Sequence, residues 1–225
     1  MSATRHKGYP GAMSATRHNG AEKGFGRVVL AASLGGVKPL TTVVAGLPAD
    51  FTVPVVVAQH RRPILNSGDA LIQILSRASC LPIRLAEDGV PADKPGVTIV
   101  PAGATATIGA NGVWALTRQT SNVGVGDAIL LSSARQTPTI AVILTGRLAD
   151  GSNGCRAVKR NGGRVLVQDP ATAQASSMPA HAIATGCVDF VLPPTRLASA
   201  ILALAMAPGG AELLTVPVPP WACLN

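Results

Sequence analysis

The sequence is poor in aromatic residues, in charge and in long apolar stretches. Only 3% of its 225 residues are aromatic and 13% are charged, whereas 47% are hydrophobic. A core must therefore be built from Val, Ala, Leu and Ile, which suits a parallel sheet covered by helices on both faces. No apolar run reaches the roughly 18 residues that a membrane-spanning helix requires. We therefore expect one sizeable domain that does not insert into a membrane.

The cysteines form no C-x-x-C pair and are widely separated, at Cys80, Cys155, Cys187 and Cys223. This spacing is typical neither of a zinc motif nor of a disulfide framework, so we expect reduced thiols in a cytoplasmic protein. The formal net charge of +8 favours an acidic partner. Nucleic acid is disfavoured as that partner, because the chain has no run of Lys and Arg and few aromatic rings to stack on bases.

The two ends of the chain lack the pattern of a folded domain. The polar hexamer Met-Ser-Ala-Thr-Arg-His occurs at residues 1–6 and again at 13–18, and such a segment cannot bury a core. This segment also lacks the apolar stretch of a secretory signal. We expect residues 1–26 to form a disordered leader, residues 27–206 to form the domain and residues 207–225 to form a Pro-rich tail.

From residue 27 onward, short apolar runs alternate with amphipathic segments. The apolar runs predict strands at 28–33, 54–59, 82–86, 97–101, 139–144, 164–168 and 188–192. The segments between them predict helices at 37–47, 69–78, 127–134, 152–161, 176–184 and 197–206. Residues 104–117 alternate around Asn111-Gly112, which is typical of an antiparallel hairpin. The sequence therefore predicts a doubly wound α/β fold, in which a mainly parallel sheet has helices on both faces and a hairpin attached.

The first predicted strand ends abruptly at Ser33, which is followed by Leu34-Gly35-Gly36. The glycines allow a sharp bend and leave the hydroxyl at the carboxyl end of a parallel strand, where ligands bind in open α/β sheets. The motifs G-x-G-x-x-G, G-x-x-x-x-G-K-[ST] and G-x-S-x-G do not occur at this turn. On spacing alone, Ser33 is either an anion-binding hydroxyl or a nucleophile.

Polar residues also follow other predicted strands at the same edge of the sheet, namely His60, Glu87-Asp88, Asp150 and Asp169. A hydroxyl, an imidazole and a carboxylate are the groups of a Ser-His-acid triad. Simpler interpretations are a solvated loop for His60, a helix N-cap for Asp150 and turns for the remaining carboxylates. The competing His181 falls within a predicted helix, where a surface position is favoured.

Four short segments occur in a distinctive order between about Val28 and Leu204. They are Ala32-Ser33-Leu34-Gly35-Gly36, Ala58-Gln59-His60, Ala86-Glu87-Asp88-Gly89 and Val142-Ile143-Leu144-Thr145-Gly146 with Asp150-Gly151. Together they resemble the catalytic domain of the chemotaxis protein-glutamate methylesterases (CheB-type). The resemblance implies a doubly wound fold distinct from that of the α/β-hydrolases, and it implies neither a metal nor a cofactor.

The resemblance also assigns roles to the residues at the strand ends. It implies that Ser33 is the nucleophile, that His60 is its base and that Asp150 orients the base. Backbone N–H groups at Leu34 and Arg147 are expected to stabilise the oxyanion. The implied reaction is hydrolysis of glutamyl methyl esters on the cytoplasmic helices of methylated chemoreceptors, releasing methanol, with glutamine deamidation as a further activity.

The chain departs from the family pattern near this site. Leu34 replaces Thr, Arg61 and Arg147 replace Met, Ala149 replaces Asn, and Val123-Gly124-Val125 replaces Arg-Pro-Ser. These departures leave a catalytically degenerate binding or regulatory module as the alternative interpretation, with a phosphate- or nucleotide-binding domain more distant. The leader is too short to hold the family's phospho-receiver domain, so we expect no control by phosphorylation within this chain.

Three arginines surround the expected site. Arg61 and Arg62 directly follow His60, and Arg147 precedes Asp150 by three positions. We expect them to form a positive rim that attracts the Glu-rich helices of a chemoreceptor.

Overall fold

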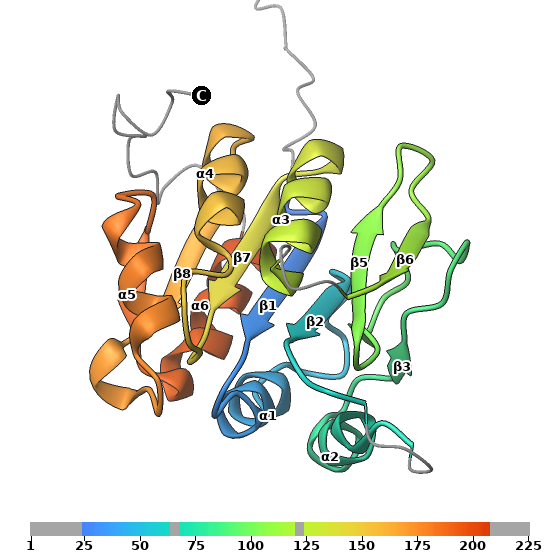
Figure 1. The fold of residues 1–225 in the computed structure, drawn as a ribbon, viewed down its shortest axis with the longest axis horizontal. Coiled ribbons are helices and arrows are strands. Elements are labelled where there is room, and N and C mark those ends of the chain that lie inside the picture. The colour runs from blue at the N-terminus through green and yellow to red at the C-terminus, as the bar shows by residue number, and fades with distance from the viewer. Residues whose placement is uncertain (1–23, 64–67, 120–123, 208–225) are drawn as a thin grey trace, which may run out of the picture.

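The computed structural model describes residues 24–63, 68–119 and 124–207 (Figure 1). Its main sheet contains the parallel strands β1 (Arg27–Ala32), β2 (Val55–Gln59), β3 (Ile83–Leu85), β4 (Val97–Ile99), β7 (Thr139–Ile143), β8 (Arg164–Gln168) and β9 (Phe190–Leu192). Their order across the sheet is β3-β4-β2-β1-β7-β8-β9. The predicted α/β fold with a mainly parallel sheet is confirmed.

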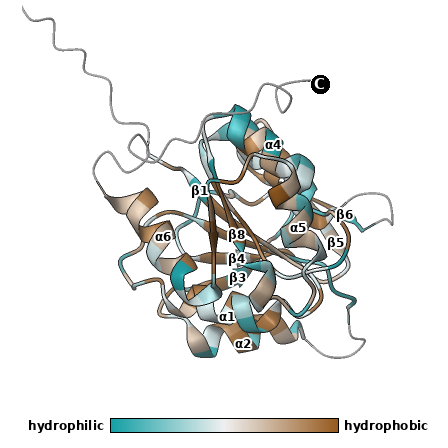
Figure 2. Cartoon of the chain, turned by 90° about the vertical axis from the view of Figure 1, so that its left-hand side faces the viewer, coloured by the Kyte–Doolittle hydropathy of each residue, from teal (hydrophilic) through white to brown (hydrophobic). Residues whose placement is uncertain are grey.

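Helices cover both faces of this sheet, as predicted. They are α1 (Val37–Ala45), α2 (Ala70–Ala78), α3 (Val125–Gln136), α4 (Ser152–Arg160), α5 (Ser177–Ala184) and α6 (Pro194–Met206), with a short 3₁₀ helix at Pro170–Thr172. Alternate residues of a strand point to opposite faces. Val29 and Ala31 of β1 accordingly join a core with α3, α4 and α5, whereas Val28 and Leu30 join a core with α1, α2 and α6. Figure 2 shows the apolar sheet between these two layers.

The predicted hairpin is present but forms a sheet of its own. Strands β5 (Ala104–Ile108) and β6 (Trp114–Arg118) pair only with each other within the described ranges, apart from one bridge between Pro91 and Val113. Ile108 and Trp114 are buried in the core with α3. The carboxylate of Asp88 accepts a 2.8 Å hydrogen bond from the Leu116 N–H. Asp88 therefore fastens the hairpin to the domain and does not take part in the site.

The domain begins before the expected boundary at residue 27. Phe25 is only 5% exposed and belongs to the core that contains α1 and α6, and the Gly26 N–H donates to the Pro138 carbonyl at 3.0 Å. The guanidinium of Arg164 lies 6.0 Å from the centre of the Phe25 ring. The expected leader boundary at residue 26 is thus wrong, because Phe25 supplies core volume in a chain with few aromatics. The repeated hexamer and residues 208–225 lie outside the described residues.

No helix in the described part of the chain is both long and apolar enough to cross a membrane. The described cysteines, Cys80, Cys155 and Cys187, are free thiols.

The strand order brings distant loops together at one edge of the sheet. β1 lies between β2 and β7, and the chain changes direction across the sheet between β1 and β7. The Ser33 N–H donates to the Thr145 carbonyl, and the His60 N–H donates to the Ala32 carbonyl, both at 3.0 Å. A crevice at such a switch point is where open α/β sheets bind ligands.

Candidate active site

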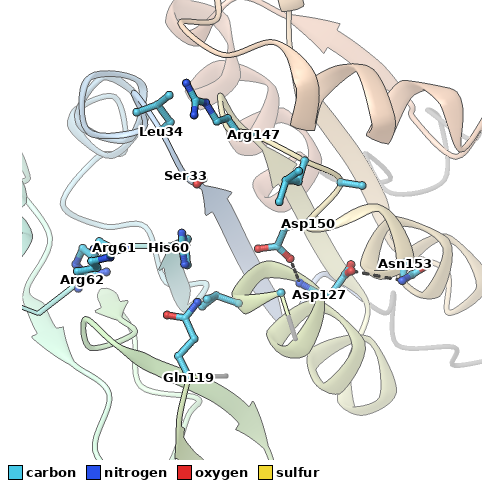
Figure 3. A pocket seen from close by; sticks show the side chains of 14 residues that line it. Ser33, Leu34, His60, Arg61, Arg62, Gln119, Asp127, Arg147, Asp150 and Asn153 are labelled. Carbon is cyan, nitrogen blue, oxygen red and sulfur yellow. Dashed lines mark hydrogen bonds between the residues drawn. The ribbon is translucent and has the colours of Figure 1, made fainter. Parts of the chain in front are cut away.

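A cavity of about 920 Å³ lies over the carboxyl ends of β1, β2 and β7 (Figure 3). It is lined by Ser33, Leu34, His60, Arg61, Arg62, Gln119, Gly124, Val125, Asp127, Arg147, Leu148, Ala149, Asp150 and Asn153. Every residue that the sequence placed in the site therefore lies at this cavity. The other polar strand ends do not line it: Glu87 and Asp88 lie towards the hairpin, and Asp169 caps the short 3₁₀ helix.

Ser33 occupies a tight turn at the tip of β1. The Gly36 N–H donates to the Ser33 carbonyl at 3.0 Å, and Gly35 has a φ of 77°, which residues with a Cβ rarely adopt. The side chain of Gln59 also donates to the Ser33 carbonyl at 3.3 Å. The turn therefore fixes the backbone of Ser33 while its side chain stays at the cavity.

Thr145 ties this turn to the loops on either side. Its buried hydroxyl lies 3.1 Å from the Leu34 carbonyl and 3.2 Å from the Ala175 carbonyl, and it accepts from the Ala175 N–H at 2.9 Å. Gly146 follows, and a Cβ there would come within 2.0 Å of the Met178 sulfur and 2.9 Å of the Ser33 Cβ. A glycine is thus required at residue 146 for the loop to approach Ser33.

His60 is exposed and projects from the end of β2 into the cavity. Figure 3 shows Ser33 at the tip of β1, His60 near the end of β2 and Asp150 close to Asp127. Within the described residues, no hydrogen bond joins the side chains of Ser33, His60 and Asp150 to one another. The structure thus places the three groups at one cavity without connecting them.

Asp150 lies against the N-terminus of α3. Its carboxylate accepts from the Gly126 N–H at 2.9 Å and from the Asp127 N–H at 2.8 Å. In return, the carboxylate of Asp127 accepts from the Gly154 N–H in the first turn of α4 at 2.8 Å. The first N–H groups of a helix lack partners within it, so each carboxylate caps one of the two helices.

Burial raises the pKa of Asp127 above its ordinary value, and the charge of Asp150 raises it further, whereas the Gly154 N–H lowers it. The position of Asp150 also depends on glycine. A Cβ at Gly124 would come within 2.0 Å of an Asp150 carboxylate oxygen. The departure from the family pattern at residue 124 therefore has a physical role, since it makes room for this carboxylate.

Arg61 differs from the expectation of a charge at the substrate rim. Its guanidinium forms an ion pair with both oxygens of Asp69 and donates to the carbonyls of Gln59 at 3.2 Å and Val100 at 2.9 Å. Asp69 in turn caps α2 by accepting from the Leu71 N–H. The guanidinium of Arg61 thus holds the loop after β2 against Asp69 and Val100.

The remaining arginines at the rim are exposed. Arg62 and Arg147 line the main cavity, and Arg62 with Arg118 lines an adjoining hollow beside the hairpin. The structure assigns none of these three guanidinium groups a hydrogen bond to a described residue. His181, by contrast, lies on the surface of α5, where its Nδ1 is 2.8 Å from the Ser177 carbonyl, so the surface position favoured for it is confirmed.

Leu148 has the most strained backbone of the site. Its φ of 65° lies in the left-handed region, which costs a residue with a Cβ about 1 kcal/mol.

Backbone donors are available beside Ser33. In the part of the chain that the structure describes, the N–H groups of Leu34 and Arg147 donate to no other residue. Among the same residues, no cluster of three or more His, Cys, Asp or Glu side chains could hold a metal ion.

The chain matches a known protein family over most of its length. The family model for CheB methylesterase matches residues 28–201, which is most of the chain. The chain belongs to the CheB methylesterase family. The resemblance expected from the four segments around Ser33, His60, Asp88 and Asp150 is therefore confirmed.

Relatives and a solved structure agree with this assignment. The chain is 37% identical over 180 residues to protein-glutamate methylesterase/protein-glutamine glutaminase 2 of Anaeromyxobacter dehalogenans, covering 77% of this chain and 52% of the relative. It is 28% identical to a putative protein of the same kind from Leptospira interrogans, covering 79% of this chain and 93% of the relative. The Thermotoga maritima CheB methylesterase catalytic domain superposes with a TM-score of 0.70 at 34% identity, covering 78% and 96% of the two chains. The chain thus spans about half the length of several curated relatives.

Sequence reasoning missed three residues that shape the site, namely Asp127, Thr145 and Leu148. Asp127 was placed at the start of a predicted helix, which is a common position for an acidic residue and gives no sign of a partner in another helix. Thr145 belongs to one of the four segments that resemble the family, but its hydroxyl contacts Leu34 and Ala175, which are far from it in the sequence. For Leu148 only its place in the loop before Asp150 was a signal.

Proposed function

We propose that this protein is a serine esterase that hydrolyses glutamyl methyl esters on methylated chemoreceptors, yielding glutamate and methanol. The observation that carries the proposal is the convergence of Ser33, His60 and Asp150 at one cavity, at the switch point of a CheB-family domain. Several relatives are named for both methylesterase and glutaminase activity. We extend the proposal to amide hydrolysis of glutamine by the same site.

In the proposed mechanism, Ser33 attacks the ester carbonyl while His60 accepts the hydroxyl proton. His60 then donates that proton to the departing methanol oxygen, and water repeats the sequence to release the glutamate. The N–H groups of Leu34 and Arg147 stabilise the oxyanion, which is supported by their lack of other acceptors in the described structure. Such donors are effective because they are held in place before the charge develops, Leu34 by the turn at Ser33 and Arg147 by the hydrogen bonds of the adjacent Gly146.

Asp150 completes the proposed triad. Each carboxylate oxygen can accept more than one hydrogen bond, so its bonds to Gly126 and Asp127 leave capacity for the His60 ring. Catalytic hydrogen bonds are commonly long in the unliganded enzyme and tighten around the substrate. The hydrogen bonds from α3 also hold the carboxylate of Asp150 at the cavity, where it would orient the His60 ring during the reaction.

The exposed arginines support the proposed choice of partner. Arg62 and Arg147 offer positive charge at the cavity and Arg118 at the adjoining hollow, which suits the Glu-rich receptor helices that the resemblance to the family implies as the substrate. We do not assign Arg61 to binding of the receptor, because its guanidinium is paired with Asp69.

The test is methanol release from a methylated chemoreceptor by the parent protein and by Ser33→Ala. We expect a loss on the order of 10⁴-fold, with an unchanged melting temperature, because the substitution removes one atom at an accessible site. Ser176→Ala is the matched control, since Ser176 is exposed and does not line the cavity. Full activity of Ser33→Ala would refute the mechanism. Receptor binding without any Ser33-dependent release would instead identify a binding module.

A further inference from the structure

Leu148 combines two properties that do not help the fold. It is the only non-glycine residue with a positive φ in the described part of the chain, and it is 79% exposed. The left-handed conformation is unfavourable for a leucine, and an exposed leucine removes little apolar surface from water. Strain of this kind is kept mainly at functional sites, where neighbouring contacts impose it.

Hydrogen bonds on both sides of Leu148 impose its conformation. Gly146 donates to the Ala175 carbonyl and accepts from the Met178 N–H, both at 2.9 Å. The hydroxyl of Ser177 donates to the Leu148 carbonyl itself at 3.0 Å. Ala175 and the first turn of α5 therefore hold this loop in place and leave the Leu148 side chain exposed at the cavity.

A second exposed leucine lines the same cavity. Leu34 directly follows Ser33 and is 43% exposed. Exposed apolar side chains such as Val191 and Met206 occur elsewhere, but they do not line this cavity. Apolar surface that is gathered at a hollow and edged by polar groups is typical of a binding site. We refer to Leu34 and Leu148 together as the apolar lip.

We propose that the apolar lip binds aliphatic groups on the acyl side of the substrate and so determines specificity. The inference rests on the proposed function for its orientation: the alcohol part of a methyl ester is a single carbon, so an extended apolar contact must fall on the acyl side. The imposed backbone of Leu148 presents its side chain before the substrate arrives. Less conformational entropy is then lost on binding.

The experiment measures binding without turnover, using 3-pentanone, 3-hexanone and 3-octanone. In these neutral ketones a CH₂ group replaces the ester oxygen of a methyl ester, so they cannot be hydrolysed. Dissociation constants are obtained by NMR titration of the parent, Leu148→Asn and Leu148→Met. Asn tolerates the left-handed region and removes the apolar contact, whereas Met keeps that contact.

We expect the parent to bind about four-fold more tightly for each methylene that becomes buried. Leu148→Met should keep most of this dependence on chain length, and Leu148→Asn should reduce it to less than two-fold per methylene. Leu148→Asn should also melt no lower than the parent, because it relieves strain and removes no buried contact. Val191→Asn, at an exposed position outside the cavity, should behave as the parent.

Equal chain-length dependence in the parent and Leu148→Asn would overturn the proposal, as would a uniform loss that includes 3-pentanone. Absence of any preference for the longer ketones in the parent would overturn it as well. These outcomes do not depend on hydrolysis. Refutation of the proposed function by an active Ser33→Ala variant and refutation of the apolar lip by the ketone titrations are therefore separate results.

Discussion

Asp127 and Asp150 each cap the helix that belongs to the other. Asp150 lies next to Gly151, the N-cap of α4, but accepts hydrogen bonds from α3. Asp127 of α3 in turn accepts a hydrogen bond from α4. The two carboxylates stabilise two helix N-termini, yet they also repel each other. Because one of them is the proposed acid of the triad, the packing of α3 against α4 and the geometry of the site are linked.

The first prediction concerns stability and pH. The pKa of Asp127 is raised in the fold by burial and by Asp150, so ionised Asp127 opposes folding. The contribution of Asp127 to the stability of the parent should therefore fall as the pH rises from the ordinary Asp value of 3.8 to the raised pKa, and this loss should stay constant above it. Asp127→Asn, which can still accept from Gly154, should lack that loss.

The measurement is urea unfolding of both proteins between about pH 3 and pH 7. The stability of Asp127→Asn relative to the parent should rise through the acidic range and then level off. Parallel curves would show that Asp127 does not titrate with a raised pKa.

The second prediction concerns the space at Gly124. Gly124→Ala places a Cβ within 2.0 Å of the Asp150 carboxylate, which must then leave the N–H groups of α3. We expect at least a ten-fold fall in kcat and a loss of about 1 kcal/mol in stability from the missing cap. Gly68→Ala is the control, because among the described residues, apart from its chain neighbours, no atom lies within 4 Å of its added Cβ. A fall of similar size in both variants would contradict the steric explanation.

The third prediction separates two adjacent arginines. Arg62→Ala should raise KM for the methylated receptor by a few-fold and reduce its dependence on salt, while kcat for a small neutral methyl ester stays the same. The charge is exposed and acts on association, which salt screens beyond about 8 Å. Arg61→Ala should instead lower the free energy of unfolding by about 2 kcal/mol, because Asp69 loses its partner.

Kinetics at two salt concentrations and urea unfolding check both variants. Arg196→Ala is the control, as Arg196 is exposed on α6 and lines neither hollow at the site. A stability loss in Arg62→Ala, or none in Arg61→Ala, would reverse the two assignments.

The fourth prediction concerns the start of the domain. Phe25→Ala should destabilise the protein by about 3 kcal/mol, since it removes a ring that is 5% exposed. A chain that starts at residue 26 should lose as much, whereas one that starts at Gly24 should keep the contact. Melting curves of the three proteins check this, and equal melting temperatures would restore the boundary at residue 27.

The strands and helices were predictable because their signals are local. The run Arg164–Gln168 is bounded by a glycine pair and by Asp169-Pro170, and the observed strand has the predicted ends. The edge on which Ser33, His60 and Asp150 lie also followed from the sequence, because all parallel strands end on the same side.

The partners of the polar groups were not predictable in the same way. Arg61 and Arg62 are adjacent and chemically identical, but only Arg61 reaches Asp69 and the Val100 carbonyl. Phe25 has no apolar neighbours in sequence to mark it as core. Such contacts depend on the order of strands in the sheet, which local periodicity does not encode.

The pairing of β1 with β7 affects how the protein folds during its synthesis. Arg27 of β1 pairs with Thr139 of β7, so the first strand of this sheet to be synthesised must wait for a partner strand that is made much later. Until then β1 has an open apolar edge, which is prone to pair with other chains. Ser33 and His60 are already made at that stage, but Asp150 and the loop of Arg147 are not. A partly made chain is therefore vulnerable to aggregation and still lacks part of the proposed site, so the proposed activity can arise only after the loop between β7 and α4 has been made.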